Sequence, residues 1–209
     1  VKNVGLIDPT IIGNTYVGGL SGYFSPTTLR TDGLIQNSYV SGGTIGLAGV
    51  STNVGGLVGS MREGRIIDSW SSADIVGVSD LGGVVGYMLG GSTVFDNVYS
   101  TGSVTATNSN GRVGGLVGYL YSLDNRPMML NRVFSTGDVQ NDSLLYGTGG
   151  LVGAINPALL TSTQAHIVIQ DSYTTANVRG GGGNTGGMIG VVDWNANDAT
   201  RLSIIDSYS

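Results

Sequence analysis

Aspartate pairs are the residues of this sequence that come nearest to a catalytic arrangement. Hydrolysis of a glycosidic bond needs two carboxyl groups on opposite sides of the bond. Three pairs could supply them: Asp68 with Asp96, Asp171 with Asp206, and Asp193 with Asp198. Most of these aspartates recur at equivalent places in a repeat, which favours short polar side chains that cap turns. We therefore expect no catalytic residue and no enzyme.

Other catalytic chemistry has few residues available to it. Glu63 is the only glutamate, His166 is the only histidine, and cysteine is absent. The zinc-protease, nucleophile-elbow and phosphate-loop motifs do not occur. His166 precedes an apolar stretch, and we interpret it as a loop or strand-edge residue rather than a base.

One loop offers oxygen ligands for a hard cation. The segment 193–198 reads Asp-Trp-Asn-Ala-Asn-Asp, with oxygen donors at alternating positions. It lacks the glycine and the distant glutamate of an EF-hand loop. We expect no cofactor and no metal, with calcium at this loop as the alternative.

A short phrase repeated six times must position all of these residues. It reads Val-Gly-Gly-Leu-Val-Gly in its fullest form, as at 54–59 and 113–118. The first glycines of successive copies are 37, 27, 32, 35 and 37 residues apart. Such periods are typical of stacked supersecondary units rather than of one globular core.

A second phrase follows each copy of the first at a variable distance. An apolar residue is followed four positions later by an aromatic one, and a short stretch of small hydroxyl residues usually comes next, as in 95–104. The six aromatic residues are Tyr39, Trp70, Tyr99, Phe134, Tyr173 and Tyr208. In stacked repeats these residues would form one column, and we expect a structural ladder of rings.

Composition restricts the class of protein. The chain has 37 glycines but only 4 prolines and no collagen period. The net charge is −5, with one lysine and scattered arginines, so the basic patch of a nucleic-acid binder is absent. No apolar stretch reaches the roughly 18 residues of a membrane span, and membrane insertion is not expected. Repeats run from end to end, which predicts one continuous array over residues 1–209, a processed or excised part of a longer chain.

The repeats favour strands over helices, because β-branched residues and internal glycines weaken a helix. One repeat buries too little apolar surface to offset its own backbone entropy, so each must stack on its neighbours. We predict an all-β fold, a β-solenoid of about six imperfect repeats of roughly 27–37 residues. At period two, Ile169, Asp171 and Tyr173 would share one face of a strand.

The two phrases together resemble the GLUG-motif repeats of bacterial cell-surface and secreted proteins. The resemblance rests on Val-Gly-Gly-Leu-Val-Gly, a variable spacer, and an Ile-x-Asn/Asp-Ser-Tyr-Ser-Thr-Gly-x-Val pattern, and it covers nearly the whole chain. Val84 and Met188 replace the leucine of the motif. The resemblance implies an extracellular array of adhesin-like proteins, or the non-catalytic repeat segment of secreted proteases that cleave immunoglobulin A.

Variation between repeats is concentrated in the spacer after the glycine phrase. Equivalent insertions project from one edge of a solenoid, which makes that edge a candidate recognition surface. Aromatic and arginine side chains dominate binding hot spots. The candidate contacts are Tyr121, Arg126, Trp194 and Arg201. The alternative is that these loops only cover the sheet or pack on a neighbouring chain.

The sequence thus predicts a non-enzymatic, extracellular, structural or adhesive segment of a bacterial surface protein or filament. Its partners would be copies of itself, end to end or lateral, or flanking repeats of the same chain. The alternative function is recognition of a glycan or host surface protein through the spacer loops. A crystal-surface or ice-binding face is a further alternative, suggested by a single column of hydroxyl residues: Ser41, Ser72, Thr101, Thr136 and Thr175.

Overall fold

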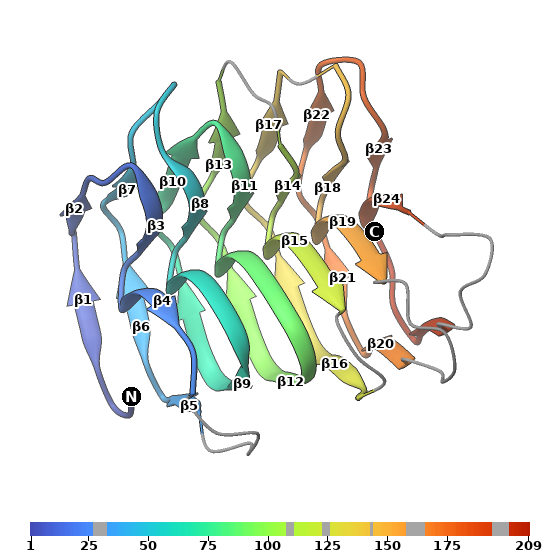
Figure 1. Ribbon diagram of the computed structural model, residues 1–209, viewed down its shortest axis with the longest axis horizontal. Coiled ribbons are helices and arrows are strands. Elements are labelled where there is room, and N and C mark those ends of the chain that lie inside the picture. Colours follow the sequence, from blue (N-terminus) through green and yellow to red (C-terminus); the bar gives the residue numbers. More distant parts are fainter. Residues whose placement is uncertain (27–32, 108–110, 123–125, 143, 158–165, 194–200) are drawn as a thin grey trace.

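A computed structural model describes residues 1–26, 33–107, 111–122, 126–142, 144–157, 166–193 and 201–209. In these ranges every regular element is a β-strand, and the strands stack as a β-solenoid, which confirms the predicted fold class (Figure 1). Across the same ranges, no helix has the length and apolar character needed to cross a membrane.

The described strands form three parallel sheets, here named A, B and C. Sheet B contains β2 (Thr10–Ile11), β7 (Thr44–Gly46), β10 (Asp74–Gly77), β13 (Val104–Ala106), β17 (Val139–Asn141) and β22 (Val178–Gly180). Sheet C contains β3 (Thr15–Gly18), β8 (Thr52–Gly55), β11 (Ser79–Gly82), β14 (Val113–Gly114), β18 (Thr148–Gly149) and β23 (Thr185–Gly186).

Sheet A is larger because each coil contributes to it twice. Its first half, A1, contains β4 (Ser21–Phe24), the start of β9 (Val58–Ser71), the start of β12 (Val85–Ser100), β15 (Val117–Ser122), β19 (Val152–Pro157) and β24 (Ile189–Val192). Its second half, A2, contains β1 (Gly5–Ile7), β5 (Leu34–Gln36), β6 (Tyr39–Ser41), the ends of β9 and β12, β16 (Met128–Ser135), β20 (His166–Gln170), β21 (Tyr173–Thr174) and β25 (Arg201–Ile205).

One coil of the solenoid runs through C, A1, A2 and B in turn. Five complete coils begin at β3, β8, β11, β14 and β18, and partial coils lie at both ends. We number the complete coils 1 to 5 and call the partial coil from β23 to β25 coil 6. Equivalent residues pair directly from coil to coil: Val54 with Leu81, Val58 with Val85, and Ile66 with Phe95. Every sheet therefore repeats the same columns along the axis (Figure 1).

The glycine phrase forms the bend between sheets C and A. At Gly115, an added Cβ atom would lie 2.1 Å from the carbonyl oxygen of Gly150 in the next coil. At Gly114 it would lie 2.1 Å from the carbonyl oxygen of Val117 within its own bend. Such distances exclude any side chain, which explains why the two glycines recur in each copy of the phrase.

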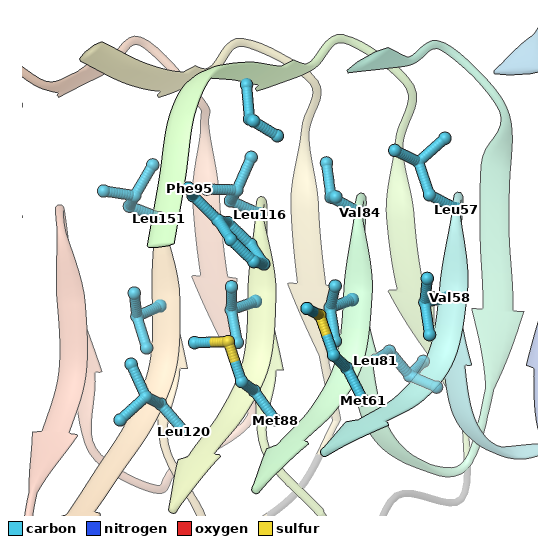
Figure 2. Packing of buried hydrophobic residues seen from close by; sticks show 14 of the residues in the cluster. Leu57, Val58, Met61, Leu81, Val84, Met88, Phe95, Leu116, Leu120 and Leu151 are labelled. Atoms are coloured by element: carbon cyan, nitrogen blue, oxygen red, sulfur yellow. The ribbon is translucent and has the colours of Figure 1, made fainter. Parts of the chain in front are cut away.

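The core lies between the sheets as rows of like side chains. Figure 2 shows Leu57, Val84, Leu116 and Leu151 in one row, and Met61, Met88 and Leu120 in another. All seven side chains are fully buried. Because the rows run along the axis, each coil buries its apolar residues mainly against the coils before and after it.

A left-handed corner in the middle of A2 overturns one expectation. The residue two positions before each of the six ladder rings has φ between 48° and 55°, in the sequence Asn37, Asp68, Asn97, Arg132, Asp171 and Asp206. Asn3 has the same conformation, with φ of 56°, two positions before Gly5, which pairs with Tyr39. Asparagine and aspartate tolerate this conformation better than most residues, which accounts for their recurrence. The corner breaks the period of two, so the prediction that Ile169, Asp171 and Tyr173 share a face is wrong. Ile169 and Ser172 point inward, whereas Asp171 is exposed and Tyr173 is half-buried on the outer face.

Serines after this corner connect neighbouring coils. The Ser69 hydroxyl donates to the Ile67 carbonyl oxygen at 2.7 Å and accepts a hydrogen bond from the Ser38 backbone N–H at 3.1 Å. Ser172 does the same, at 2.6 Å to the Gln170 carbonyl oxygen and 3.2 Å from the Val133 N–H. These hydroxyls satisfy backbone groups that the corner removes from the regular ladder.

The left-handed corner predicts how substitutions of Asp171 change the stability of the fold. Asp171→Val should lower the free energy of unfolding by about 1–2 kcal/mol, because a β-branched residue is strongly disfavoured in the left-handed region. Asp171→Asn should leave it unchanged within about 0.5 kcal/mol. Urea denaturation followed by circular dichroism measures both, and equal effects of the two substitutions would contradict the corner geometry.

Candidate functional site

The ten tyrosines of the chain lie in two places on the solenoid surface. Four belong to the ladder on A2: Tyr39, Tyr99, Tyr173 and Tyr208. The other six lie on the outer face of A1 or at its border with sheet C: Tyr16, Tyr23, Tyr87, Tyr119, Tyr121 and Tyr146. These two features are the candidates for a functional surface.

The ladder is a continuous stack of six rings. Ring centroids of neighbours are 4.5–5.8 Å apart and the ring planes differ by 4–7°. Stacking of this kind uses both faces of each internal ring and leaves only ring edges toward solvent. Tyr208, at the end of the stack, is 63% exposed. The ladder geometry therefore favours a structural role over a platform for ligands.

The A1 face carries a shorter aromatic column. Its outward positions, in register from coil to coil, are Tyr23, Ser60, Tyr87, Tyr119, Ala154 and Val191. Tyr87 and Tyr119 stack at 5.4 Å, and Tyr121 tilts against Tyr119 at 5.8 Å. The aromatic column ends at Tyr119, because alanine and valine follow it in coils 5 and 6.

Arg112 lies at the end of this column. Its guanidinium carbon is 3.9 Å from the centroid of the Tyr119 ring and 4.9 Å from that of Tyr146. Its Nη1 lies 3.3 Å from Oδ1 of Asp80 in the preceding coil. Arg112 thus joins an ion pair and two aromatic faces, an arrangement in which a desolvated cation is stabilised.

Asp80 is a buried carboxylate, 9% exposed, at a left-handed corner with φ of 53°. Burial raises the pKa of the Asp80 carboxyl, and the Arg112 guanidinium opposes that rise only in part. Burial also raises the pKa of the Tyr119 hydroxyl to about 12, so this hydroxyl stays protonated at neutral pH. The cluster therefore holds one charge pair beside neutral rings.

The raised pKa of Asp80 predicts how the free energy of unfolding depends on pH. The folded state binds this proton more tightly than the unfolded state, whose pKa is near 3.8. The stability that Asp80 contributes is therefore greatest below that value and is lost as pH rises through the folded pKa. We expect the unfolding free energy of the wild type, minus that of Asp80→Asn, to fall as pH rises above 3.8. Urea denaturation across this range measures it, and a difference that rises with pH would contradict the prediction.

A groove of about 240 Å³ opens beside Arg112, across coils 4, 5 and 6. Its polar lining consists of Arg112, Asn156, Asn184 and Asp193. Its apolar lining consists of Tyr119, Leu145, Tyr146, Ala154 and Val191. Within it, the amide of Asn156 donates to the Asp193 carboxylate at 3.3 Å. The groove lies where the aromatic column stops, and Ala154 and Val191, which follow Tyr119 in that column, form part of its lining.

The four predicted recognition residues have different surroundings. Tyr121 lies half-buried on β15, in contact with Tyr119. Arg126 follows β15 and forms an ion pair with Glu63, with its Nη1 at 3.1 Å from Oε2. Trp194 lies outside the described residues. The backbone of Arg201 pairs with that of His166 in sheet A, and its side chain is outside the described part of the chain.

The Arg126–Glu63 pair spans one whole coil. Glu63 belongs to coil 2 and Arg126 to coil 4, 63 residues later. The glutamate side chain crosses Gly90 of coil 3, where an added Cβ atom would lie 2.9 Å from the Glu63 Cγ atom. A bidentate pair that bridges two coils points to a structural contribution of Arg126.

Two of the three predicted carboxylate pairs and the histidine lie on the surface, whereas Asp198 of the third pair is outside the described residues. Asp68 accepts a hydrogen bond from Asn97 at 2.8 Å, and Asp96 forms an ion pair with Arg132 at 2.8 Å. Asp171 and Asp206 occupy the same exposed corner in neighbouring coils. The His166 Nε2 atom lies 3.0 Å from the Ser203 hydroxyl, at an exposed site.

The calcium alternative falls mostly on residues that the structure does not describe. Of the loop 193–198, only Asp193 is described. Among the described residues, no group of three or more histidine and carboxylate side chains could hold a metal ion.

Sequence reasoning missed the Arg112 cluster. Arg112 immediately precedes the glycine phrase, where other coils carry Tyr16, Asn53, Asp80, Gly147 and Asn184. A basic residue next to an acidic one in this column was a signal that the pair could meet across coils. Tyr146 carried no comparable signal, because its contact depends on the length of the loop before β18.

Comparisons with known proteins give one relative. No family model matches the chain, and no solved structure matches it at a significant level. Halomucin of Haloquadratum walsbyi (strain DSM 16790 / HBSQ001) is 31% identical in an alignment 154 residues long, and the match covers 66% of this chain. The match covers 2% of the length of Halomucin. The resemblance to GLUG-motif repeats therefore stays a prediction.

Proposed function

We propose that this chain is a structural segment of an extracellular surface protein, a stiff spacer built from stacked coils. The observation that carries the proposal is the matched register of equivalent residues from coil to coil, which is found in all three sheets and in the ring ladder, with a shift between Leu89 and Thr93 where β12 pairs with β9. Each complete coil pairs with its neighbours through strands in all three sheets, and we expect such stacking to resist bending and stretching. Surface proteins use spacers of this kind to hold other domains away from the cell.

Two further observations support the extracellular part of the proposal. Only 11% of the residues are charged, and Ser, Thr, Asn and Gly are frequent in the sequence. It is similar to a small part of Halomucin, whose name refers to mucins, a class of extracellular proteins. Adhesion and filament formation would be properties of the parent protein in this scheme.

The neighbours of the spacer would be flanking coils of the same chain. Val1 and Ile204 continue the apolar core column of Ile35 and Ile169, yet they are 46% and 47% exposed. Another coil stacked on either end would bury these side chains and pair the open strand edges.

Duplication of one coil tests the spacer proposal. Residues 54–80 form one complete period, because Val54 pairs with Leu81. A variant that carries this segment twice in tandem should fold, gain about 4.8 Å in length, and keep or raise its melting temperature. Small-angle X-ray scattering and thermal unfolding measure the two quantities. An unchanged length or a partly unfolded product would overturn the proposal.

The location is tested on intact cells that express the parent protein. An antibody against this segment should label unpermeabilised cells, and external protease should remove the signal. Labelling that appears only after permeabilisation would contradict an extracellular location.

A further inference from the structure

The groove beside Arg112 differs from the rest of the solenoid in a way that folding alone does not require. Stacking favours like residues in a column, as in the ladder on A2. On A1 the column has serine at coil 2 and changes from tyrosine to alanine and valine at coils 5 and 6, where Ala154 and Val191 form part of the groove lining. Positions at which a sequence departs from the residue pattern of its fold are often functional sites.

The walls of the groove are fixed in place. Arg112 is bonded to the buried Asp80 and lies 3.9 Å from the centre of the Tyr119 ring. Tyr119 is only 8% exposed, so its ring is held by packing. A site whose side chains are already ordered loses little entropy when a ligand binds.

The polar lining offers both donors and acceptors. Asn156 and Asn184 carry amides, which donate and accept, Arg112 donates, and the Asp193 carboxylate accepts. These four side chains come from coils 4, 5 and 6, and the rest of the lining is apolar. Alternating hydroxyl groups and C–H patches of a sugar ring match a surface of this kind.

Charge narrows the ligand class. The positive charge of Arg112 is offset by Asp80, which disfavours a phosphate or sulfate as the main ligand. Asp193 is the one carboxylate in the described lining, too few for the six to eight oxygens that a calcium ion prefers. The groove, at about 240 Å³, is smaller than the roughly 300–1,000 Å³ of sites for drug-sized molecules.

We propose that this groove binds one neutral sugar residue of a glycan chain. The inference goes beyond the spacer role, because a spacer needs no binding site and would function without one. A single ring with few contacts should bind with a Kd on the order of 1 mM. Repetition of such segments in a long protein would raise the overall avidity.

Saturation-transfer NMR on the whole chain tests the proposal. The probes are methyl glycosides of glucose, galactose, mannose and N-acetylglucosamine, with glucuronate and galactose sulfate as charged comparisons, each at about 10 mM, tenfold above the expected Kd. We expect transfer to at least one neutral glycoside. No transfer to any neutral probe, or transfer only to the charged ones, would overturn the proposal.

Two variants locate the binding. Ala154→Tyr extends the column of Tyr87 and Tyr119 and fills the groove, and it should reduce the affinity at least tenfold while the chain stays folded. Asp193→Ala removes the acceptor and should weaken binding several-fold without a change in the core.

Asp138→Ala is the matched control. Like Asp193, Asp138 is exposed and accepts one amide hydrogen bond, from Asn177 at 2.8 Å, but it lies outside the groove lining. It should leave the affinity unchanged. Equal effects of Asp193→Ala and Asp138→Ala, or full binding by Ala154→Tyr, would place the sugar elsewhere and overturn the assignment. If Ala154→Tyr unfolds, the two aspartate variants decide the matter.

Discussion

Gly115→Ala should destabilise the solenoid by about 3 kcal/mol or more, the largest effect that we expect from one added methyl group. The new Cβ atom would lie 2.1 Å from the Gly150 carbonyl oxygen and 2.8 Å from the Ser135 hydroxyl. Backbone atoms of the next coil cannot move away without a break in the hydrogen bonds between coils. For a chain of this size we expect the melting temperature to fall by roughly 6–12 °C.

Gly13→Ala is the control for this experiment. Its added Cβ atom would meet only the Val17 side chain, at 3.1 Å, and no backbone atom within 4 Å. We expect a change of less than about 1 kcal/mol. If Gly13→Ala and Gly115→Ala lowered the free energy of unfolding equally, the loss of stability at Gly115 would reflect the general effect of replacing glycine by alanine rather than close packing between coils.

Tyr99→Ala should cost about 2–4 kcal/mol, the second large effect. Tyr99 stacks on Trp70 at 5.8 Å and on Phe134 at 4.5 Å, so its removal interrupts the ladder in the middle. Each aromatic pair contributes about 0.5–1.5 kcal/mol beyond the burial of the ring. The loss of two pairs and of part of the buried area gives the expected range.

Two companion variants separate stacking from other contributions. Tyr99→Phe keeps both stacks and should change the stability by less than about 0.5 kcal/mol. Tyr208→Ala removes one stack, at 5.2 Å from Tyr173, from a ring that is 63% exposed, and should cost no more than about 1.5 kcal/mol. Chemical denaturation measures all three, and an effect at Tyr208 equal to that at Tyr99 would contradict cumulative stacking.

The same two features show how far the sequence could be interpreted. The repeated glycines and the aromatic residue of the second phrase have fixed spacing within each copy, so their columns follow once coils stack. To predict the glycine column and the aromatic column, one needs only the local sequence and the assumption that the coils stack. The left-handed corner between Ile169 and Tyr173 was less accessible, because short polar side chains that recur at one place in a repeat also fit ordinary turn capping. Its effect on which side chains point inward appears only in the backbone angles.

The candidate groove depended on information that the sequence does not display. Arg112 meets Asp80 from 32 residues away, and Arg126 meets Glu63 from 63 residues away, across an intervening coil. Asp80 and Arg112 both directly precede a copy of the glycine phrase, which is a sequence signal for that pair, whereas spacers of variable length separate Glu63 from Arg126, and no fixed interval marks them as partners. The predicted recognition set shared only residue type and loop position, and the structure assigns Arg126 to an ion pair within the solenoid.

The sequence by itself determined the all-β solenoid, its period, the close-packed glycines and the ring column, because identical short phrases can bury their apolar residues only by stacking on one another. The tertiary structure alone decided which outward side chains meet. Contacts between coils depend on register, corner geometry and loop length together. The Arg112 cluster and its groove arise from all three, since they form where the tyrosines of the A1 column stop and Ala154 and Val191 follow.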